Sequence, residues 1–164
     1  MAIEFRVLGP VEALVDGRPA RLAPRPRAVL AVLLLHAGDV VSASRLIDAV
    51  WGDDPPDTAT NVLQGYVSSL RKALGRDVVE TREPGYVVRI ERAGLDLREF
   101  ERLATDGTRA LESDCETAAE LLRQALDLWH GQALADIADG DSAAVTARSY
   151  AIVAMSAAST PLLR

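Results

Sequence analysis

The sequence predicts an α+β domain over residues 1–92 and an all-α segment over residues 95–164. Alternating apolar and polar segments and a β-rich hairpin occur only before residue 92, whereas the spacing after Leu95 is purely helical. The charge divides at the same place. Residues 1–92 contain 12 Arg or Lys and 12 Asp or Glu, and residues 93–164 contain 6 and 12. The net charge of −6 therefore lies in the helical segment, and the two parts are expected to contact different partners.

Three antiparallel strands are expected at the start of the chain, over residues 3–7, 11–15 and 18–22. Gly9-Pro10 and Asp16-Gly17 separate them. Asp-Gly is a strong hairpin signal, because both central positions of a primed turn need positive φ. A small antiparallel sheet is therefore expected before the first helix.

Three helices are expected next. They cover residues 27–37, 44–51 and 58–74, and a glycine follows each of them (Gly38, Gly52 and Gly75). Ser42 or Ser44 is expected to cap the second helix, and Asp57 or Thr58 the third. A short strand at 40–41 and a hairpin over 78–90, turning at Glu83-Pro84-Gly85, complete the domain.

The third helix is amphipathic. Its apolar stripe repeats at intervals of four, three and four residues (Leu63, Val67, Leu70 and Leu74). A second set has the same spacing but begins two residues earlier, about 160° away around the axis, and is expected to face solvent (Asn61, Gly65, Ser68 and Lys72). Gln64 and Arg71 widen this outer face.

The outer face has a composition that suits DNA reading. Asn61 is the only asparagine of the chain, Lys72 is its only lysine, and the face carries no acid. Amides can pair with adenine edges, Arg and Lys reach guanine or phosphate, and Gly65 and Ser68 let the backbone approach the groove. Gly65 also costs roughly 1 kcal/mol of helix propensity, which close approach to DNA would offset. Spacing alone is equally compatible with an ordinary solvated face.

The order of the elements favours DNA binding. A short helix, a capped turn, a longer helix with an uncharged to basic outer face and a twisted hairpin predict a winged helix-turn-helix. The predicted fold class is thus an α+β winged helix-turn-helix with N-terminal antiparallel strands and a C-terminal wing, followed by an all-α, tetratricopeptide-like segment.

Ordered motifs run through the whole predicted domain. They are FRVLGP at 5–10, RAVLAVLLL at 27–35, VS at 41–42, RLIDAVWG at 45–52, DPP at 54–56, NVLQ at 61–64, YVS at 66–68, LRKALG at 70–75 and PGY at 84–86. In these motifs the chain resembles the Streptomyces antibiotic regulatory protein family of transcriptional activators. In that family an OmpR-like winged helix precedes a bacterial transcriptional activation domain.

The resemblance implies a recognition helix within residues 58–75 and a wing at 78–90. Base reading is expected from four residues (Asn61, Gln64, Gly65 and Ser68). Contacts with the DNA backbone are expected from six cations (Arg25, Arg27, Arg45, Arg71, Lys72 and Arg82). Phosphate contacts position a protein on DNA and set its salt dependence, whereas base contacts specify the sequence.

Residues 97–103, 119–129 and 131–137 are similar to the opening of the family's activation domain. The resemblance implies transcriptional activation of a biosynthetic gene cluster, contact with RNA polymerase and head-to-tail homodimers on direct repeats of promoter DNA. Leu121 and Trp129 are the candidate partner contacts. The family continues with further helices, so residues 95–164 are interpreted as a partial, truncated activation domain, because fewer than about three helical repeats are rarely stable alone.

Other function classes lack support in the sequence. It contains no P-loop and no paired metal-ligand motif, so neither an enzyme nor a cofactor is expected. The longest apolar run, residues 28–35, is far shorter than the roughly 20 residues that a membrane span requires. Cys115 has no second thiol to pair with and is expected at a helix start. A cytoplasmic location is expected.

Two interpretations of the function stay open on the sequence. The first is a sequence-specific DNA-binding regulator that activates transcription. The second is a truncated regulator or protein-interaction module that competes with full-length activators without recruiting RNA polymerase. Trp51 and Trp129 are expected to anchor a core or an interface rather than to stack on a ligand.

Overall fold

The computed structural model describes residues 2–90 and 93–134. The N-terminal strands are β1 (Ile3–Arg6), β2 (Glu12–Val15) and β3 (Arg18–Pro19), and they pair antiparallel as predicted. Asp16 and Gly17 have φ values of 50° and 76°, which confirms the predicted primed turn. A fourth strand, β7 (Ala93–Leu95), pairs in parallel with β1 and gives the sheet order β3-β2-β1-β7.

The three helices of the first domain are α1 (Pro24–Leu35), α2 (Ala43–Trp51) and α3 (Ala59–Leu74). Helix α1 starts three residues earlier than predicted, because its two prolines lie in the first turn, where the backbone N–H has no helical partner to lose. Ser42 caps α2 as expected, since its Oγ accepts a hydrogen bond from the backbone N–H of Arg45 at 3.2 Å. Thr58 precedes α3, although its hydroxyl makes no capping bond.

The wing is a second sheet with the order β4-β6-β5, formed by β4 (Val41–Ser42), β5 (Val79–Arg82) and β6 (Gly85–Val88). Gly85 permits the pairing of β6 with β4. A Cβ atom at this position would lie 1.9 Å from the carbonyl oxygen of Val41. The steric need for glycine thus accounts physically for the PGY motif.

Helices α1, α2 and α3 and the wing enclose one core. The predicted stripe of α3 is buried, with Leu63, Val67, Leu70 and Leu74 each at most 1% exposed. Helix α1 is buried nearly all round from Val29 to Leu35. The rings of Trp51 and Tyr66 stack at a centroid distance of 5.7 Å and join α2 to α3, so Trp51 is an anchor within the fold.

Strand β7 lies between the two predicted parts and ends at Leu95. Helix α4 (Asp96–Ala110) follows at once. Its first residue binds the backbone directly after β1, because the Asp96 carboxylate accepts hydrogen bonds from the N–H groups of Val7, at 2.9 Å, and Leu8, at 3.0 Å. The Arg98 guanidinium donates to the carbonyl of Ala37 at 2.6 Å. The two parts therefore share a hydrogen-bonded junction.

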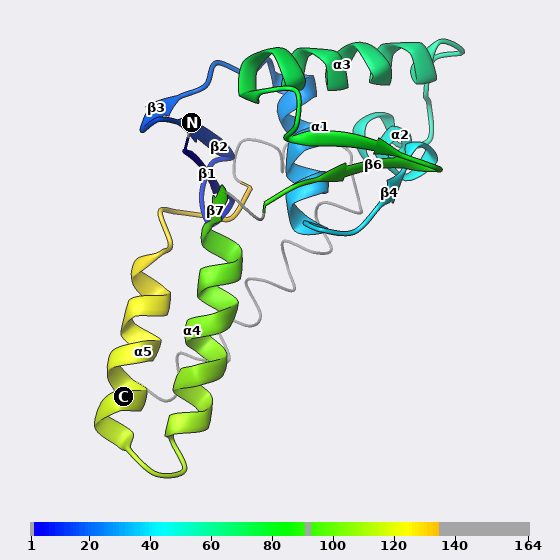
Figure 1. The fold of residues 1–164 in the computed structure, drawn as a ribbon. Coiled ribbons are helices and arrows are strands. Elements are labelled where there is room, and N and C mark those ends of the chain that lie inside the picture. Colours follow the sequence, from blue (N-terminus) through cyan, green and yellow to red (C-terminus); the bar gives the residue numbers. More distant parts are fainter. Residues whose placement is uncertain (1, 91–92, 135–164) are drawn as a thin grey trace.

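Helix α5 (Cys115–Asp127) packs beside α4, and Figure 1 shows this helical pair extending away from α3. Cys115 lies at the exposed helix start, as predicted, with Asp114 as the N-cap. Gly107 lies inside α4 and is buried. A Cβ atom there would be 2.8 Å from Cγ of Leu122, so Gly107 permits close contact between the two helices.

Within residues 2–90 and 93–134, no helix is both long and apolar enough to cross a membrane. The same residues contain no cluster of His, Cys, Asp and Glu side chains that could hold a metal ion. The rest of the predicted helical segment, residues 135–164, lies outside the described residues.

Candidate nucleic-acid interface

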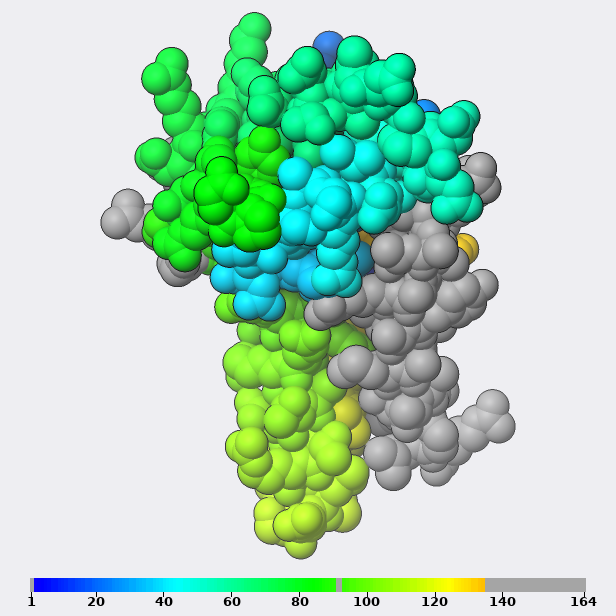
Figure 2. Space-filling model, turned by 90° about the vertical axis from the view of Figure 1, so that its right-hand side faces the viewer, coloured from blue at the N-terminus to red at the C-terminus, as the bar shows by residue number. Residues whose placement is uncertain are grey.

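Helix α3 presents the predicted polar face to solvent. Asn61, Gln64, Gly65, Ser68 and Lys72 are all exposed, on the side opposite to the buried stripe. In Figures 1 and 2 the helix forms an outer ridge of the molecule, at the end far from α4 and α5. A long ligand such as a DNA duplex can therefore reach this ridge without meeting the helical pair.

Two further exposed residues belong to the same face. Thr60 lies four residues before Gln64, and Ser69 lies four residues after Gly65. Both place a hydroxyl group beside the predicted readers. Extending the helical spacing by one turn along the outer face would have identified them in the sequence.

Gly65 has no structural reason to be glycine. A Cβ atom added there would meet no atom within 4 Å, and its φ lies outside the positive range. Glycine inside a helix lowers stability by roughly 1 kcal/mol relative to alanine. Gly65 thus leaves an open position in the middle of the exposed face, where a DNA groove could approach the helix backbone closely.

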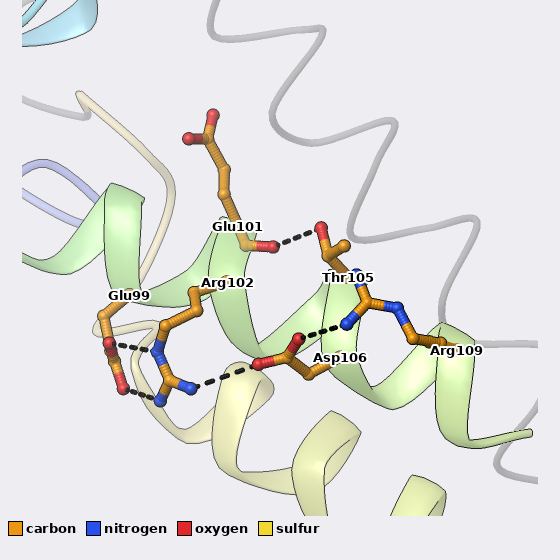
Figure 3. A network of polar contacts seen from close by, with 6 residues as sticks. All are labelled: Glu99, Glu101, Arg102, Thr105, Asp106 and Arg109. Atoms are coloured by element: carbon orange, nitrogen blue, oxygen red, sulfur yellow. Dashed lines mark hydrogen bonds and ion pairs between the residues drawn. The ribbon is translucent and has the colours of Figure 1, made fainter.

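The exposed face of α4 provides an internal reference for a solvated helix. Glu99, Arg102, Asp106 and Arg109 alternate in sign and form a ladder of ion pairs, with 2.6 Å between Arg102 Nη2 and Glu99 Oε1 (Figure 3). This is the mixed pattern that keeps a helix soluble. The outer face of α3 has no such ladder in its sequence, because α3 contains no acidic residue.

Of the predicted DNA-backbone-contacting cations, three donate hydrogen bonds to backbone carbonyls of the chain itself. Nη1 of Arg25 donates to the carbonyl of Val50 at 2.6 Å, at the end of α2, and Nη2 of Arg27 donates to the carbonyl of Leu22 at 3.0 Å. Both hydrogen bonds thereby also help to hold α1 in its position in the domain. Arg25 remains exposed, so its guanidinium is still accessible from solvent.

Arg71, the third, joins the recognition helix to the wing. Its Nε donates to the carbonyl of Val79 and its Nη2 to Oγ1 of Thr81, both at 2.8 Å. Arg71 was expected on the outer face of α3, but the structure shows it half-buried between α3 and β5. An open hollow of about 1550 Å³ adjoins this junction, and Ser68, Arg71, Lys72 and Thr81 are among the residues that line it.

The positive charges of Arg82 and Arg89 on the wing are partly compensated by Glu80. Glu80 accepts a hydrogen bond from Nε of Arg89 at 2.6 Å and lies 3.5 Å from Nε of Arg82. The hydrogen bond from Arg89 is the main cause that lowers the pKa of Glu80 below its usual value. Arg82 remains exposed next to the turn of the hairpin.

Arg45 and Lys72 are exposed, and the described residues offer neither of them a side-chain hydrogen bond or an ion pair. Arg45 lies in the first turn of α2 and Lys72 in the last turn of α3. These two cations are therefore available, without rearrangement, for contacts with phosphate.

The two candidate partner contacts pack inside the chain. Leu121 and Trp129 are half-buried against the core, and the Trp129 ring meets Phe100 edge-on at a centroid distance of 5.6 Å. Trp129 is thus an intramolecular anchor, and its role as a partner contact stays a prediction.

Comparisons with known proteins match both parts. Residues 17–94 match the family described as "Transcriptional regulatory protein, C terminal", and residues 95–161 match "Bacterial transcriptional activator domain". The chain is 43% identical over 139 residues to the regulatory protein AfsR of Streptomyces coelicolor, covering 83% of this chain and 14% of AfsR. It is 38% identical over 151 residues to the regulatory protein DnrI of Streptomyces peucetius, covering 84% of this chain and 56% of DnrI.

A solved structure agrees with the fold. Mycobacterium tuberculosis EmbR, in complex with a low-affinity phosphopeptide, matches with a TM-score of 0.88 at 33% identity, over 96% of this chain and 43% of EmbR. The chain therefore spans only part of the length of these relatives. The predicted α+β winged helix followed by a helical segment is confirmed, and both matched families are non-enzymatic. The chain belongs to the Streptomyces antibiotic regulatory protein family, with an OmpR-type winged helix joined to a bacterial transcriptional activator domain.

Proposed function

We propose that the chain binds specific sequences in promoter DNA and activates transcription of a biosynthetic gene cluster. The observation that carries the first half is the exposed face of α3, which is uncharged apart from Lys72 and lies beside a wing that ends in exposed Arg82. Family membership supports the second half.

In this proposal α3 lies in the major groove and the hairpin β5–β6 lies against the neighbouring minor groove or its phosphates. Asn61, Gln64, Gly65 and Ser68 meet the base edges. Arg45 and Lys72 contact phosphates on either side of the reading face, and Arg82 does so from the wing. Arg25 and Arg27 supply further positive charge at the start of α1, and Arg71 holds the wing at the distance that lets helix and hairpin bind together.

The test is the binding of the full 164-residue chain to promoter fragments at several salt concentrations. Single substitutions Arg45→Ala, Lys72→Ala and Arg82→Ala remove one proposed phosphate contact each. Each is expected to weaken binding on all sequences alike and to reduce the slope of log affinity against log salt by about 1. Arg109→Ala on α4 is the matched control, because it removes an exposed arginine far from α3.

Equal slopes for all four variants would contradict the proposed interface. Absence of binding by a folded chain would contradict the DNA function itself and favour a protein-interaction module. Activation is tested separately with a reporter gene behind the bound promoter. Binding without activation would indicate a competitor of full-length activators, and the reporter would then also test the proposed contact with RNA polymerase.

The pairing of two chains on direct repeats is part of the same proposal, because a single winged helix contacts few base pairs and gains affinity by binding as a pair. Mass measurements of the complex with one half-site and with two test this directly. Two chains on the double site, with higher affinity than on the single site, is the expected result.

A further inference from the structure

The geometry points to an operator half-site that presents two adenines, about one base step apart, to the side-chain amides of Asn61 and Gln64. This inference rests on the proposed function and deepens it, because it names the class of DNA sequence that the α3 face selects. It concerns the first two turns of α3, where the two amides are the longest exposed side chains.

The spacing of the amides matches the spacing of stacked bases. Asn61 and Gln64 lie three residues apart, which is about 4.5 Å along a helix and about 60° around it. Stacked bases in one strand of DNA are about 3.4 Å apart. One face of α3 can therefore hold both amides against consecutive base pairs.

The chemistry of the amides matches adenine. The major-groove edge of adenine has one acceptor, N7, and one donor group at N6. A side-chain amide carries the complementary NH₂ donor and carbonyl acceptor, so each amide can make two hydrogen bonds to one adenine. Guanine presents two acceptors at this edge, which the amide carbonyl cannot satisfy.

The side chain that would read guanine is engaged elsewhere. Arg71 is the only arginine of α3, and both its Nε and its Nη2 are bonded to strand β5. Lys72, the remaining cation of the helix, lies eight residues after Gln64, which is about 12 Å along the axis. Cations are therefore absent from the part of the described helix that carries the amides.

The neighbouring positions allow the amides to reach the bases. Gly65 follows Gln64 and leaves open space where a Cβ atom would be. Thr60 and Ser68 are exposed and short. None of these residues extends as far as an amide side chain, so the backbone of α3 can approach the groove until Asn61 and Gln64 touch the base edges.

The experiment selects binding sites from random duplex DNA with the full chain and with two variants, Asn61→Ala and Gln64→Ala. Gln124→Ala is the matched control, because it removes an exposed side-chain amide from α5, far from α3. The selected site is then resynthesised with 7-deazaadenine, which lacks the N7 acceptor, at each adenine in turn. The expected result is a loss of about tenfold in affinity at two neighbouring adenines, with each loss absent in one of the two variants.

A further variant of Gln64 tests whether the side chain at this position sets the preferred base. Gln64→Arg is expected to change the base preference at one position from adenine to guanine, because the guanidinium can donate two hydrogen bonds to O6 and N7. The rest of the selected site is expected to stay the same.

The outcomes separate this inference from the proposed function. Enrichment of a site whose adenines tolerate 7-deaza substitution, or which Asn61→Ala and Gln64→Ala select unchanged, would overturn the adenine assignment while leaving DNA binding intact. Failure of the folded chain to enrich any sequence would overturn sequence-specific binding, and the adenine assignment with it.

Discussion

Helices α3 and α4 are both amphipathic and of similar length, with 16 and 15 residues, but their exposed faces differ. The exposed face of α4 alternates acid and base and bonds to itself, as the ladder from Glu99 to Arg109 shows. The exposed face of α3 carries amides, hydroxyls and a glycine. The need for solubility therefore does not explain the composition of the outer face of α3, since the exposed face of α4 is made soluble by ion pairs.

The helices also differ in how they are attached. The first residue of α4 binds the backbone of the N-terminal sheet, and Arg98 binds the end of α1. Helix α3 is attached to the fold by its buried stripe and by the hydrogen bonds of Arg71. The side chains of its outer face do not pack against other parts of the described chain. Substitutions on α4 at the junction are therefore expected to change stability, and those on the face of α3 to change binding.

The largest effect is expected at the start of α4. Asp96→Ala leaves the buried N–H groups of Val7 and Leu8 without an acceptor, and we expect a loss of about 3 kcal/mol in the free energy of unfolding. Asp106→Ala, in the exposed ladder, is the control and is expected to cost below about 1 kcal/mol. Urea denaturation followed by circular dichroism measures both. Equal losses would show that Asp96 does not hold the junction.

Arg71 is expected to affect both stability and DNA binding. Arg71→Ala removes two hydrogen bonds between α3 and β5, which should lower the unfolding free energy by about 1–2 kcal/mol and also weaken DNA binding by releasing the wing. Lys72→Ala, at the next position, should weaken binding with a change in stability within about 0.5 kcal/mol. Denaturation and DNA titration of both variants provide the test. A stability loss in Lys72→Ala alone would reverse the two assignments.

Replacing Gly107 of α4 and Gly65 of α3 by alanine should change the stability of the chain in opposite directions. Gly107→Ala places a Cβ atom 2.8 Å from Leu122, so α4 and α5 must separate, at an expected cost of about 1 kcal/mol or more. Gly65→Ala meets open space and should stabilise α3 by about 1 kcal/mol while weakening DNA binding. Thermal unfolding and DNA titration distinguish the two. Unchanged DNA affinity in Gly65→Ala would contradict close approach at this position.

The smallest effect concerns pH. Burial raises the pKa of Asp96, against the opposing hydrogen bonds from Leu8, Val7 and Leu97, whereas the hydrogen bond from Arg102 lowers the pKa of Glu99. The part of the stability that depends on the protonation of Asp96 is thus greatest below its ordinary pKa of 3.8 and declines as the pH rises through its folded value. That of Glu99 is present above its ordinary pKa of 4.5 and is lost as the pH falls through its folded value.

Carboxyl NMR titration of the folded chain measures both groups. The pKa of Asp96 should lie above its ordinary value and that of Glu99 below its own, and Arg102→Ala should return Glu99 toward its ordinary value without moving Asp96. A pKa of Asp96 at or below its ordinary value would contradict its burial. Because α3 carries no acidic side chain, DNA binding should owe none of its pH dependence in the acidic range to α3.

Much of the winged helix could be predicted from local patterns. The Asp16-Gly17 turn, the buried stripe of α3 and the exposure of Asn61 and Gln64 follow from spacings of two and 3.6 residues, which act over a few neighbours. The early start of α1 escaped prediction because proline is usually taken as a break, although it is well tolerated in the first turn of a helix.

The order of the elements, the face of α3 that meets solvent and the residue types on that face all follow from local sequence, because they depend on neighbours within one or two turns. Long-range packing sets the pairing of β7 with β1, the hydrogen bonds of Arg71 to β5 and the contact of Gly107 with Leu122. Each of these contacts joins residues separated by further secondary structure or a turn. Only the packing of the whole chain determines which of the many possible partners they meet.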